Sequence, residues 1–181
     1  MRFKEYNDVL PSIQHEWFKE QLESLDFMWA FNQDSTYTGR EAEGLSSRHP
    51  SFSSLIFESE HNYCNQHSFK KFELIILTLL HTAKLNSQRL QRVRLGLYLP
   101  IKTDTEYNNI HTDRRNKHTV LLYYVNDNDG DTYWFDENDN IIHKVTPKAN
   151  TAIVFDGSIR HASSNPSVGF KISLNLNIDE S

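Results

Sequence analysis

The spacing of apolar residues in this chain changes at Arg92, and this change restricts the possible fold more than any other feature. Ahead of Arg92, two segments repeat apolar residues every three or four positions, which is the spacing of one helical face. From Arg92 to Leu99 the repeat is two, so valine and leucines face one way and arginines, glycine and tyrosine face the other. The sequence therefore predicts helices first and short strands afterwards.

The pattern predicts two helices and six strands. The first helix follows Pro11, a residue suited to a first turn, and its apolar residues are Ile13, Trp17, Leu22 and Leu25. The second begins at Ser68 and ends near Lys84. The expected strands are 92–99, 119–126, 132–135, 141–145, 151–155 and 170–178. Helices ahead of many short strands predict a β-sandwich or a jelly-roll barrel with the helices on one outer face.

A polar segment from Gln33 to Ser54 separates the two predicted helices, and Gly39, Gly44 and Pro50 interrupt any regular pattern in it. Loops of this length in compact domains are usually functional lids or disordered. We therefore expect one domain over residues 1–181, with helical support and a candidate lid loop in 1–90 and the β core in 91–181.

Charge and cysteine content exclude some classes of function. Lys and Arg number 19 against 24 Asp and Glu, a net charge of −5, so no overall basic field favours non-specific binding of nucleic acid. The one cysteine, Cys64, cannot form an internal disulfide, and the longest apolar stretch, Leu74 to Leu80, is too short to span a bilayer. Because the first residues also lack the apolar run of a signal peptide, we expect a cytoplasmic protein with no membrane partner.

The first and last predicted strands carry polar residues opposite their aliphatic face. Arg92 and Arg94 lie on this face of the first strand, and Lys171 lies on that of the last. Such a face either meets solvent, which is the commoner case in antiparallel sheets, or lines a barrel interior that holds a polar ligand. For Arg94 we favour the interior.

Candidate metal ligands bear on this choice. His111 and Asp113 lie two residues apart, so on an extended segment both side chains point to the same side. His161 follows later in the chain, and Lys171 comes ten residues after it. Two histidines and one carboxylate match the facial triad of non-haem Fe(II) oxygenases, which leaves three coordination positions open. A lysine inside a barrel requires an anionic partner, so the pattern predicts a metal together with an anion.

Three motifs follow one another in the second half of the chain: HTDRRNKHTVLLYYVNDNDGDTYWF, VTPKANTAIVFDG and RHASSNPSVGFKISLN. In this order they resemble the 2-oxoglutarate- and Fe(II)-dependent oxygenases, specifically the prolyl-hydroxylase-like branch. The N-terminal segment ahead of them is similar to that of small stand-alone phage and bacterial members of the family. The resemblance implies a mainly β fold with N-terminal helices, a double-stranded β-helix (jelly roll, cupin-like), in which His111, Asp113 and His161 bind Fe(II).

The same resemblance implies a site for the co-substrate 2-oxoglutarate. Lys171 would pair with its distal carboxylate. Tyr124 falls where prolyl hydroxylases present a tyrosine to that carboxylate, and Tyr98 and Ser173 are further candidates for binding it.

The chain departs from the family pattern at two places. Gly130-Asp131 replaces the usual Gly-Gly, and Asn175 and Asn177 stand where many members have an aromatic residue. The second departure affects the expected substrate pocket. The basic residues around His118 form either a solvated loop or an edge that touches the substrate. The candidate substrate contacts are Arg94, Arg115 and Asn175.

The activity implied by the resemblance is that of a dioxygenase that couples oxidative decarboxylation of 2-oxoglutarate to hydroxylation of a substrate. It requires Fe(II), 2-oxoglutarate and O2, with ascorbate as a candidate reductant. A prolyl residue in a peptide or protein is the first expectation for the substrate. The alternatives are hydroxylation of a free amino acid or other small molecule, and a cupin-like binding module without turnover. Nucleic-acid demethylation is disfavoured, because the segment after Lys171 lacks the R-x-N-x-T-x-R ending of that branch.

Overall fold

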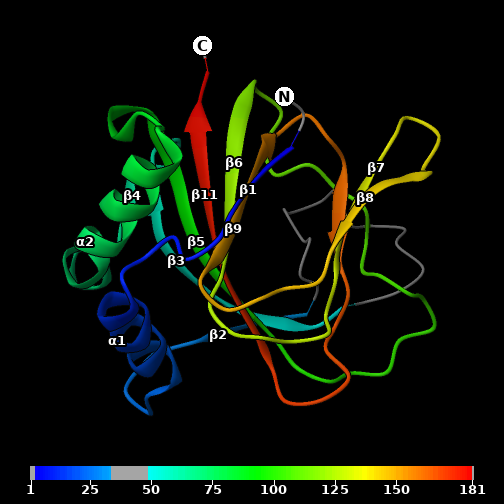
Figure 1. Ribbon diagram of the computed structural model, residues 1–181, viewed down its shortest axis with the longest axis horizontal. Helices are drawn as coiled ribbons and strands as arrows, with labels where there is room; N and C mark the ends of the chain where they lie inside the picture. Colours follow the sequence, from blue (N-terminus) through cyan, green and yellow to red (C-terminus); the bar gives the residue numbers. More distant parts are fainter. Residues whose placement is uncertain (1–2, 34–48, 181) are drawn as a thin grey trace.

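Two antiparallel sheets form the core of the chain (Figure 1). The structure is a computed structural model and describes residues 3–33 and 49–180. The larger sheet has the order β1 (Phe3–Tyr6), β9 (Thr151–Asp156), β6 (His118–Tyr124), β11 (Lys171–Asp179), β5 (Leu90–Tyr98), β3 (Ser51–Glu58) and β2 (Ala30–Asn32), and β4 (Tyr63–Cys64) pairs with β3. The smaller sheet has the order β10 (His161–Ser163), β7 (Thr132–Phe135) and β8 (Ile141–Val145).

Strands that are distant in sequence lie side by side in the larger sheet. The last strand, β11, pairs with β5 on one edge and with β6 on the other. The first strand, β1, pairs with β9. These pairings confirm a mainly β fold with a helix near the N-terminus, and they join the two halves of the chain into one sheet.

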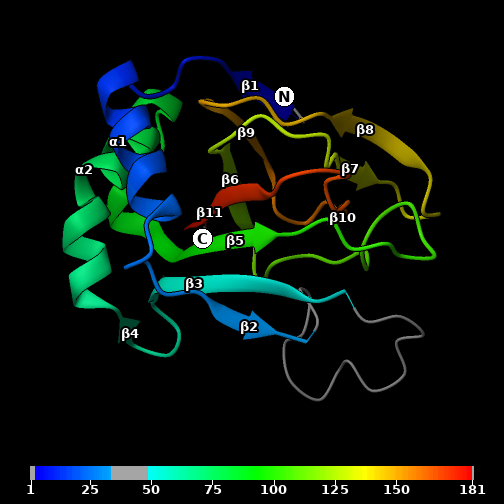
Figure 2. The ribbon, with the colours of Figure 1, turned by 90° about the horizontal axis from the view of Figure 1, so that it is seen from below.

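Both helices cover the same face of the larger sheet (Figure 2). They are α1 (Ser12–Glu23) and α2 (Gln66–Ala83), and a short 3-10 helix, η2 (Ser87–Arg89), precedes β5. The side chain of Asn65 accepts a hydrogen bond from the backbone N–H of Ser68 at 3.1 Å and so caps α2. Neither α-helix in residues 3–33 and 49–180 is long and apolar enough to cross a membrane.

The buried face of α1 differs from the expected one. Of the four expected residues, Ile13, Trp17 and Leu25 are exposed and Leu22 is buried, and α1 also buries His15 and Phe18. His15 belongs to this stripe because its Nδ1 lies 2.7 Å from the Tyr123 hydroxyl of β6, which satisfies the buried imidazole. The buried face of α1 thus combines Phe18 and Leu22 of the apolar core with a histidine whose partner lies on a distant strand.

The two faces of β5 and β11 show whether their polar residues meet solvent or line an interior, which the sequence had left open. Their aliphatic residues, Val93, Leu95, Leu174 and Leu176, pack with those of the helices in one apolar core. Their polar residues, among them Arg94 and Ser173, line a cavity on the opposite side of the sheet. The polar face is therefore an interior surface, as expected for a barrel that holds a polar ligand.

The N-terminal half contains more sheet than the sequence indicated. Strands β1 to β4 were not anticipated, and β3 includes Ser51 to Ser54, which the expected polar loop had covered. Short strands at a sheet edge have little periodic signal, because pairing with neighbours stabilises them more than their own residues do. Residues 34–48, and with them the expected lid, lie outside the described residues.

Candidate metal centre

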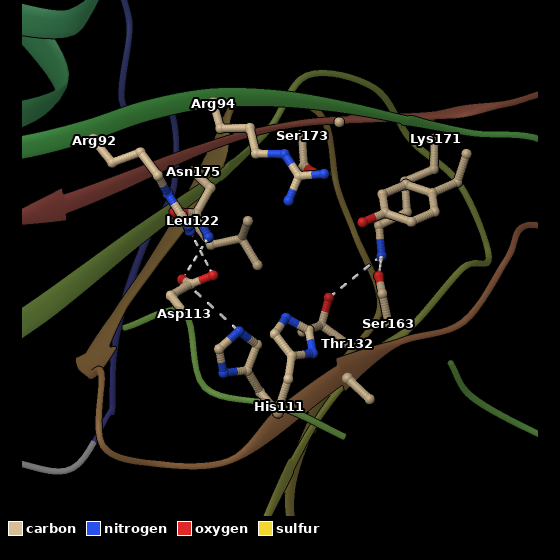
Figure 3. Close-up of a pocket in the computed structure, with 14 residues that line it drawn as sticks. Arg92, Arg94, His111, Asp113, Leu122, Thr132, Ser163, Lys171, Ser173 and Asn175 are labelled. Atoms are coloured by element: carbon tan, nitrogen blue, oxygen red, sulfur yellow. Dashed lines mark hydrogen bonds and ion pairs between the residues drawn. The ribbon is translucent and has the colours of Figure 1, made fainter. Parts of the chain in front are cut away.

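The side chains of His111, Asp113 and His161 meet where the segment before β6 crosses β10. Figure 3 shows two of them, His111 and Asp113, at the wall of a cavity. His111 and His161 form an antiparallel bridge, with the N–H of His111 3.0 Å from the carbonyl oxygen of His161 and the reverse bond at 2.8 Å. This bridge sets their ring centroids 4.7 Å apart. One ligand atom from each imidazole and one from Asp113 all lie within 4.8 Å of one another. The structure thus brings the predicted trio together.

Both imidazoles are oriented by backbone carbonyls. Nδ1 of His111 donates to the carbonyl oxygen of Asn109 at 3.0 Å, and Nδ1 of His161 donates to that of Ile159 at 3.1 Å. Because a carbonyl oxygen only accepts, Nδ1 carries a proton in both rings, and Nε2 is the nitrogen left to bind a metal. Burial and the neighbouring His161 lower the pKa of His111 to about 4, so this imidazole is neutral at pH 7. These are the conditions for a metal ligand.

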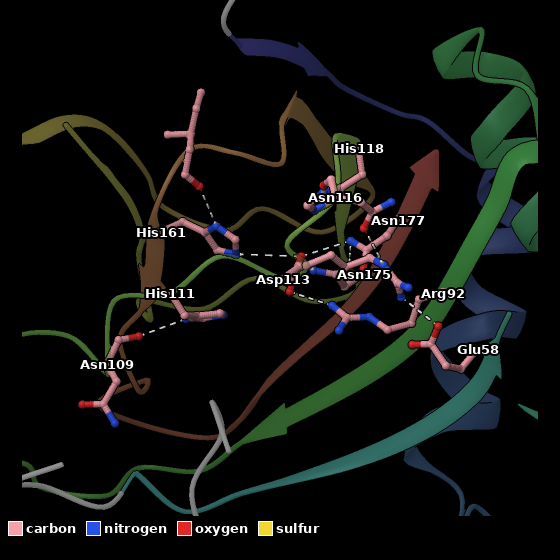
Figure 4. A network of polar contacts seen from close by, with 12 residues as sticks. Glu58, Arg92, Asn109, His111, Asp113, Asn116, His118, His161, Asn175 and Asn177 are labelled. Carbon is pink, nitrogen blue, oxygen red and sulfur yellow. Dashed lines mark hydrogen bonds and ion pairs between the residues drawn. The ribbon is translucent and has the colours of Figure 1, made fainter. Parts of the chain in front are cut away.

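Donors contact both oxygens of the Asp113 carboxylate (Figure 4). Nη2 of Arg92 donates to Oδ1 at 2.6 Å, and the amides of Asn175 and Asn177 donate to Oδ2 at 2.9 and 3.1 Å. Oδ2 lies 3.9 Å from Nε2 of His161. Burial alone would raise the pKa of Asp113, but the Arg92 guanidinium holds it well below its usual range. The carboxylate is therefore ionised.

Lys171 lies at the opposite end of the cavity and is only 1% exposed. Its ammonium donates to the carbonyl oxygen of Gly130 at 2.7 Å and to the hydroxyl of Ser163, and lies 3.4 Å from that of Thr132. No carboxylate in the described part of the chain forms an ion pair with it. Burial lowers the pKa of Lys171 to about 7. Lys171 is thus a buried amine whose hydrogen-bond partners in the described residues are uncharged.

Hydroxyl groups surround this lysine. The ring centroids of Tyr98 and Tyr124 lie 5.8 and 5.9 Å from its Nζ. Tyr124 donates to the hydroxyl of Thr132 at 2.9 Å. Burial raises the pKa of both phenols, so they remain neutral hydrogen-bond donors. Ser173 lines the cavity together with Tyr98 and Lys171. Tyr124, which pairs with Ser173 across β6 and β11, is not among the residues that line it and is linked to Lys171 through Thr132.

A single cavity joins the two ends. Its middle is formed by Arg94 and Asn175, which lie opposite each other in β5 and β11, and by Leu122 of β6. Asn175, expected to contact substrate, turns its amide to Asp113 instead of to the open space. Arg94 lines the cavity as expected.

Arg115 does not line this cavity. It is exposed and lies at a separate hollow beyond Asp113, where Arg114 forms ion pairs with Glu58 at 2.7 Å and Glu60 at 2.6 Å. His118, in the same basic cluster, is fully buried, and a Cβ on Gly157 would lie 2.2 Å from its Nε2. The cluster is thus divided between a packed histidine and a solvated edge.

Sequence reasoning assigned no contact in the site to four polar residues, although it named Arg92 and Asn177. Thr132 and Ser163 pair with each other across β7 and β10 and contact Lys171. Ser163 follows His161 by two residues in a strand, so its direction could have been foreseen from alternation. Arg92 and Asn177 contact Asp113 through tertiary pairing, for which the sequence contains no local signal.

No protein-family model matches the chain, and no curated protein matches it in sequence. Solved structures do match. An oxidoreductase of the 2OG-Fe(II) oxygenase family from Burkholderia pseudomallei has a TM-score of 0.69 at 10% identity, over 99% of this chain and 86% of that one. A prolyl hydroxylase from Trichoplax adhaerens, in complex with a hypoxia-inducible-factor peptide fragment, has a TM-score of 0.62 at 14% identity, over 98% and 84%.

A third structure is the non-haem alpha-ketoglutarate-dependent epimerase SnoN from nogalamycin biosynthesis. Its TM-score is 0.65 at 9% identity, over 98% of this chain and 78% of that one. The chain therefore has the jelly-roll fold of 2-oxoglutarate- and Fe(II)-dependent oxygenases, as the resemblance in sequence implied. Proteins of this fold include prolyl hydroxylases and an epimerase, so the fold by itself does not define the reaction.

Proposed function

We propose that this protein is an Fe(II)- and 2-oxoglutarate-dependent oxygenase that hydroxylates its substrate. The observation that carries the proposal is the charge arrangement of one cavity. One end has two imidazoles and a carboxylate, and the other has a buried lysine that forms no ion pair with an acid of the described residues. A metal fits the first end, and an anion fits the second. 2-Oxoglutarate has a keto acid to chelate a metal and a second carboxylate for the lysine.

The residues present fit these groups. Two imidazoles and one carboxylate suit Fe(II) and leave three of six coordination positions open. His111, Asp113 and His161 would hold the iron through two Nε2 atoms and a carboxylate oxygen. When bound, iron, 2-oxoglutarate and O2 supply the oxidation of substrate and the decarboxylation to succinate, with ascorbate as a candidate reductant.

The chain itself contributes binding and orientation. The Lys171 ammonium binds the distal carboxylate, and this contact raises its pKa again, so the proton stays on Nζ. The hydroxyls of Tyr98 and Ser173 line the cavity and add hydrogen bonds to the same carboxylate, and Tyr124 supports this end through its hydrogen bond to Thr132. Ser163 and Thr132 hold the ammonium in place. Burial of this end excludes water and strengthens each of these contacts.

For the substrate, a prolyl residue of a peptide or protein is the leading candidate. Support comes from prolyl hydroxylases among the proteins of similar fold, one of them with a bound peptide. The epimerase of similar fold favours the second candidate, a small molecule. Arg94, which lines the cavity, and Arg115, at the separate hollow beyond Asp113, are the proposed substrate contacts.

Turnover tests the proposal. The protein is loaded with Fe(II) without oxygen, given 2-oxoglutarate and a panel of prolyl peptides and free amino acids, and then exposed to O2 while succinate is measured. We expect succinate from the parent and none from His111→Ala or Lys171→Ala. His67→Ala and Lys70→Ala change the same residue types at exposed positions of α2 and serve as matched controls.

The outcomes separate the alternatives. Mass spectrometry should find the mass of one oxygen atom added to a peptide or to a small molecule, which identifies the substrate class. A parent that binds Fe(II) and 2-oxoglutarate but releases no succinate with any compound would indicate a cupin-like binding module instead. A parent that binds neither would overturn the proposed function.

A further inference from the structure

Side-chain contacts, not backbone pairing, position the Asp113 carboxylate. Residues 112–117, between the bridge at His111 and strand β6, belong to no helix or strand. The contacts come from two adjacent strands, with Arg92 on β5 and Asn175 and Asn177 on β11 (Figure 4). Arg92 and Asn177 lie directly opposite each other in that pair of strands.

Arg92 is committed to Asp113. Glu58, the acid opposite Arg92 in β3, is paired with Arg114 at 2.7 Å. Among the described residues, Arg92 forms its ion pair with Asp113 at 2.6 Å, and the two side chains are only 11% and 7% exposed. A charge-assisted contact at this distance and burial is strong and is little weakened by solvent.

The two oxygens of Asp113 therefore differ. Oδ1 faces a guanidinium, so a second cation cannot approach it without repulsion. Oδ2 accepts only from neutral amides and lies 3.9 Å from Nε2 of His161. Asn177 also donates to the amide oxygen of Asn175 at 3.0 Å, which holds the Asn175 amide in its orientation.

We propose that Arg92 is a positioning residue that restricts Asp113 to a single metal-binding oxygen. The inference rests on the proposed function, because it concerns the metal of that centre. A carboxylate that bound through both oxygens would occupy two positions and leave only two open. A chelating co-substrate would then fill both, and O2 would have none. By occupying Oδ1, Arg92 keeps the third position available.

Counting metal-bound water tests this assignment without turnover. Mn(II), which also prefers six ligands, is bound to the protein, and water proton relaxation measures the waters on it. The parent should hold three. Arg92→Met removes the guanidinium, lets both oxygens bind, and should reduce the water contribution to relaxation by about a third. Saturating 2-oxoglutarate should leave one water in the parent and none in the variant.

Three further variants test whether the effect arises at Oδ1 or at Oδ2 of Asp113. Asn175→Ala removes a donor from Oδ2, and Arg92→Lys keeps a cation for Oδ1, so both should retain three waters. Arg92→Gln, whose shorter amide reaches only the position of the arginine Nε, should behave as Arg92→Met and preserves the test if the methionine variant does not fold. Circular dichroism of the metal-free variants checks folding.

The results distinguish two failures. Three waters in both Arg92→Met and Arg92→Gln, with Mn(II) bound, would overturn the role of Arg92 and leave the metal centre intact. Two waters in Asn175→Ala would also contradict it, because Oδ1 is still occupied there. A parent that binds no Mn(II) would overturn the proposed metal centre itself, and the role of Arg92 with it.

Discussion

The two ends of the cavity bury charge in opposite ways. At the metal end, the Asp113 carboxylate meets the Arg92 guanidinium and two amides, so its charge is balanced before any metal binds. At the other end, the hydrogen bonds of Lys171 within the described residues all go to uncharged oxygens. Both groups are buried, but among residues 3–33 and 49–180 only one of the two, the carboxylate, forms an ion pair.

This difference indicates what each end requires. A balanced carboxylate keeps its position without a ligand, which suits a centre that must present fixed geometry to a metal. An unbalanced ammonium is unfavourable until an anion arrives, so part of the binding energy of that anion goes to offset the burial. The metal end is therefore preorganised, and the lysine end is specific for negative charge.

The largest effect on stability and metal binding is expected from removal of the Asp113 carboxylate. Asp113→Ala should abolish Mn(II) binding and destabilise the metal-free protein by about 3–5 kcal/mol, because Arg92 remains buried without its partner. Urea denaturation and Mn(II) titration measure the two effects. Adding Arg92→Met to this variant should restore much of the stability without restoring metal binding. A single variant as stable as the parent would contradict the described balance of charge.

Removal of the Lys171 charge should change the stability of the metal-free protein in the opposite direction. Lys171→Met should stabilise the metal-free protein by roughly 1–3 kcal/mol, because a buried ammonium without an acidic partner is replaced by an apolar chain of similar length. The same change should eliminate binding of 2-oxoglutarate, measured by calorimetry on the Mn(II) form. Lys70→Met on the exposed face of α2 is the control. Loss of stability in Lys171→Met would show that this end is balanced after all.

The smallest effect is the dependence of the lysine end on pH. With a pKa of about 7 in the folded protein, Lys171 loses its charge as the pH rises, so 2-oxoglutarate should bind about tenfold more weakly at pH 8 than at pH 6. Arginine stays charged, so Lys171→Arg should remove this dependence, whatever its own affinity. A parent affinity that does not change over this range would contradict the depressed pKa.

The stability of the metal-free protein should follow the same titration. The folded pKa of about 7 lies below the ordinary value of 10.5, so between these values the unfolded chain binds more protons than the folded one. Stability therefore rises with pH across this window, and it is lowest, with respect to this group, below pH 7. Urea denaturation at pH 7 and pH 9 should detect the rise in the parent and not in Lys171→Met.

Much of the β core was visible in the sequence. The alternation in Arg92 to Leu99 predicted β5, and the period-two segments after it predicted β6, β7, β8, β9 and β11. The strands that were missed, β1 to β4 and β10, are mostly short or lie toward the edges of the sheets. For such strands the partner supplies the stability, so the local pattern is weak.

The candidate site also contains residues that the sequence identified and contacts that only the structure shows. Spacing and residue type identified His111, Asp113, His161 and Lys171, and the structure gathers all four around one cavity. The same reasoning assigned Asn175 to a substrate and attached no role to Arg92 as a partner of Asp113. In the structure both contact that carboxylate.

The sequence by itself determined the order of elements, the alternation of the core strands and the set of groups able to bind a metal and an anion, because these depend on residue type and local spacing. Only the tertiary structure decided which charges are paired. Arg92 reaches Asp113, and Lys171 remains without an acidic partner, because β5 lies beside β11 and β10 beside β7. Such pairings join residues far apart in the chain, and no local pattern encodes them.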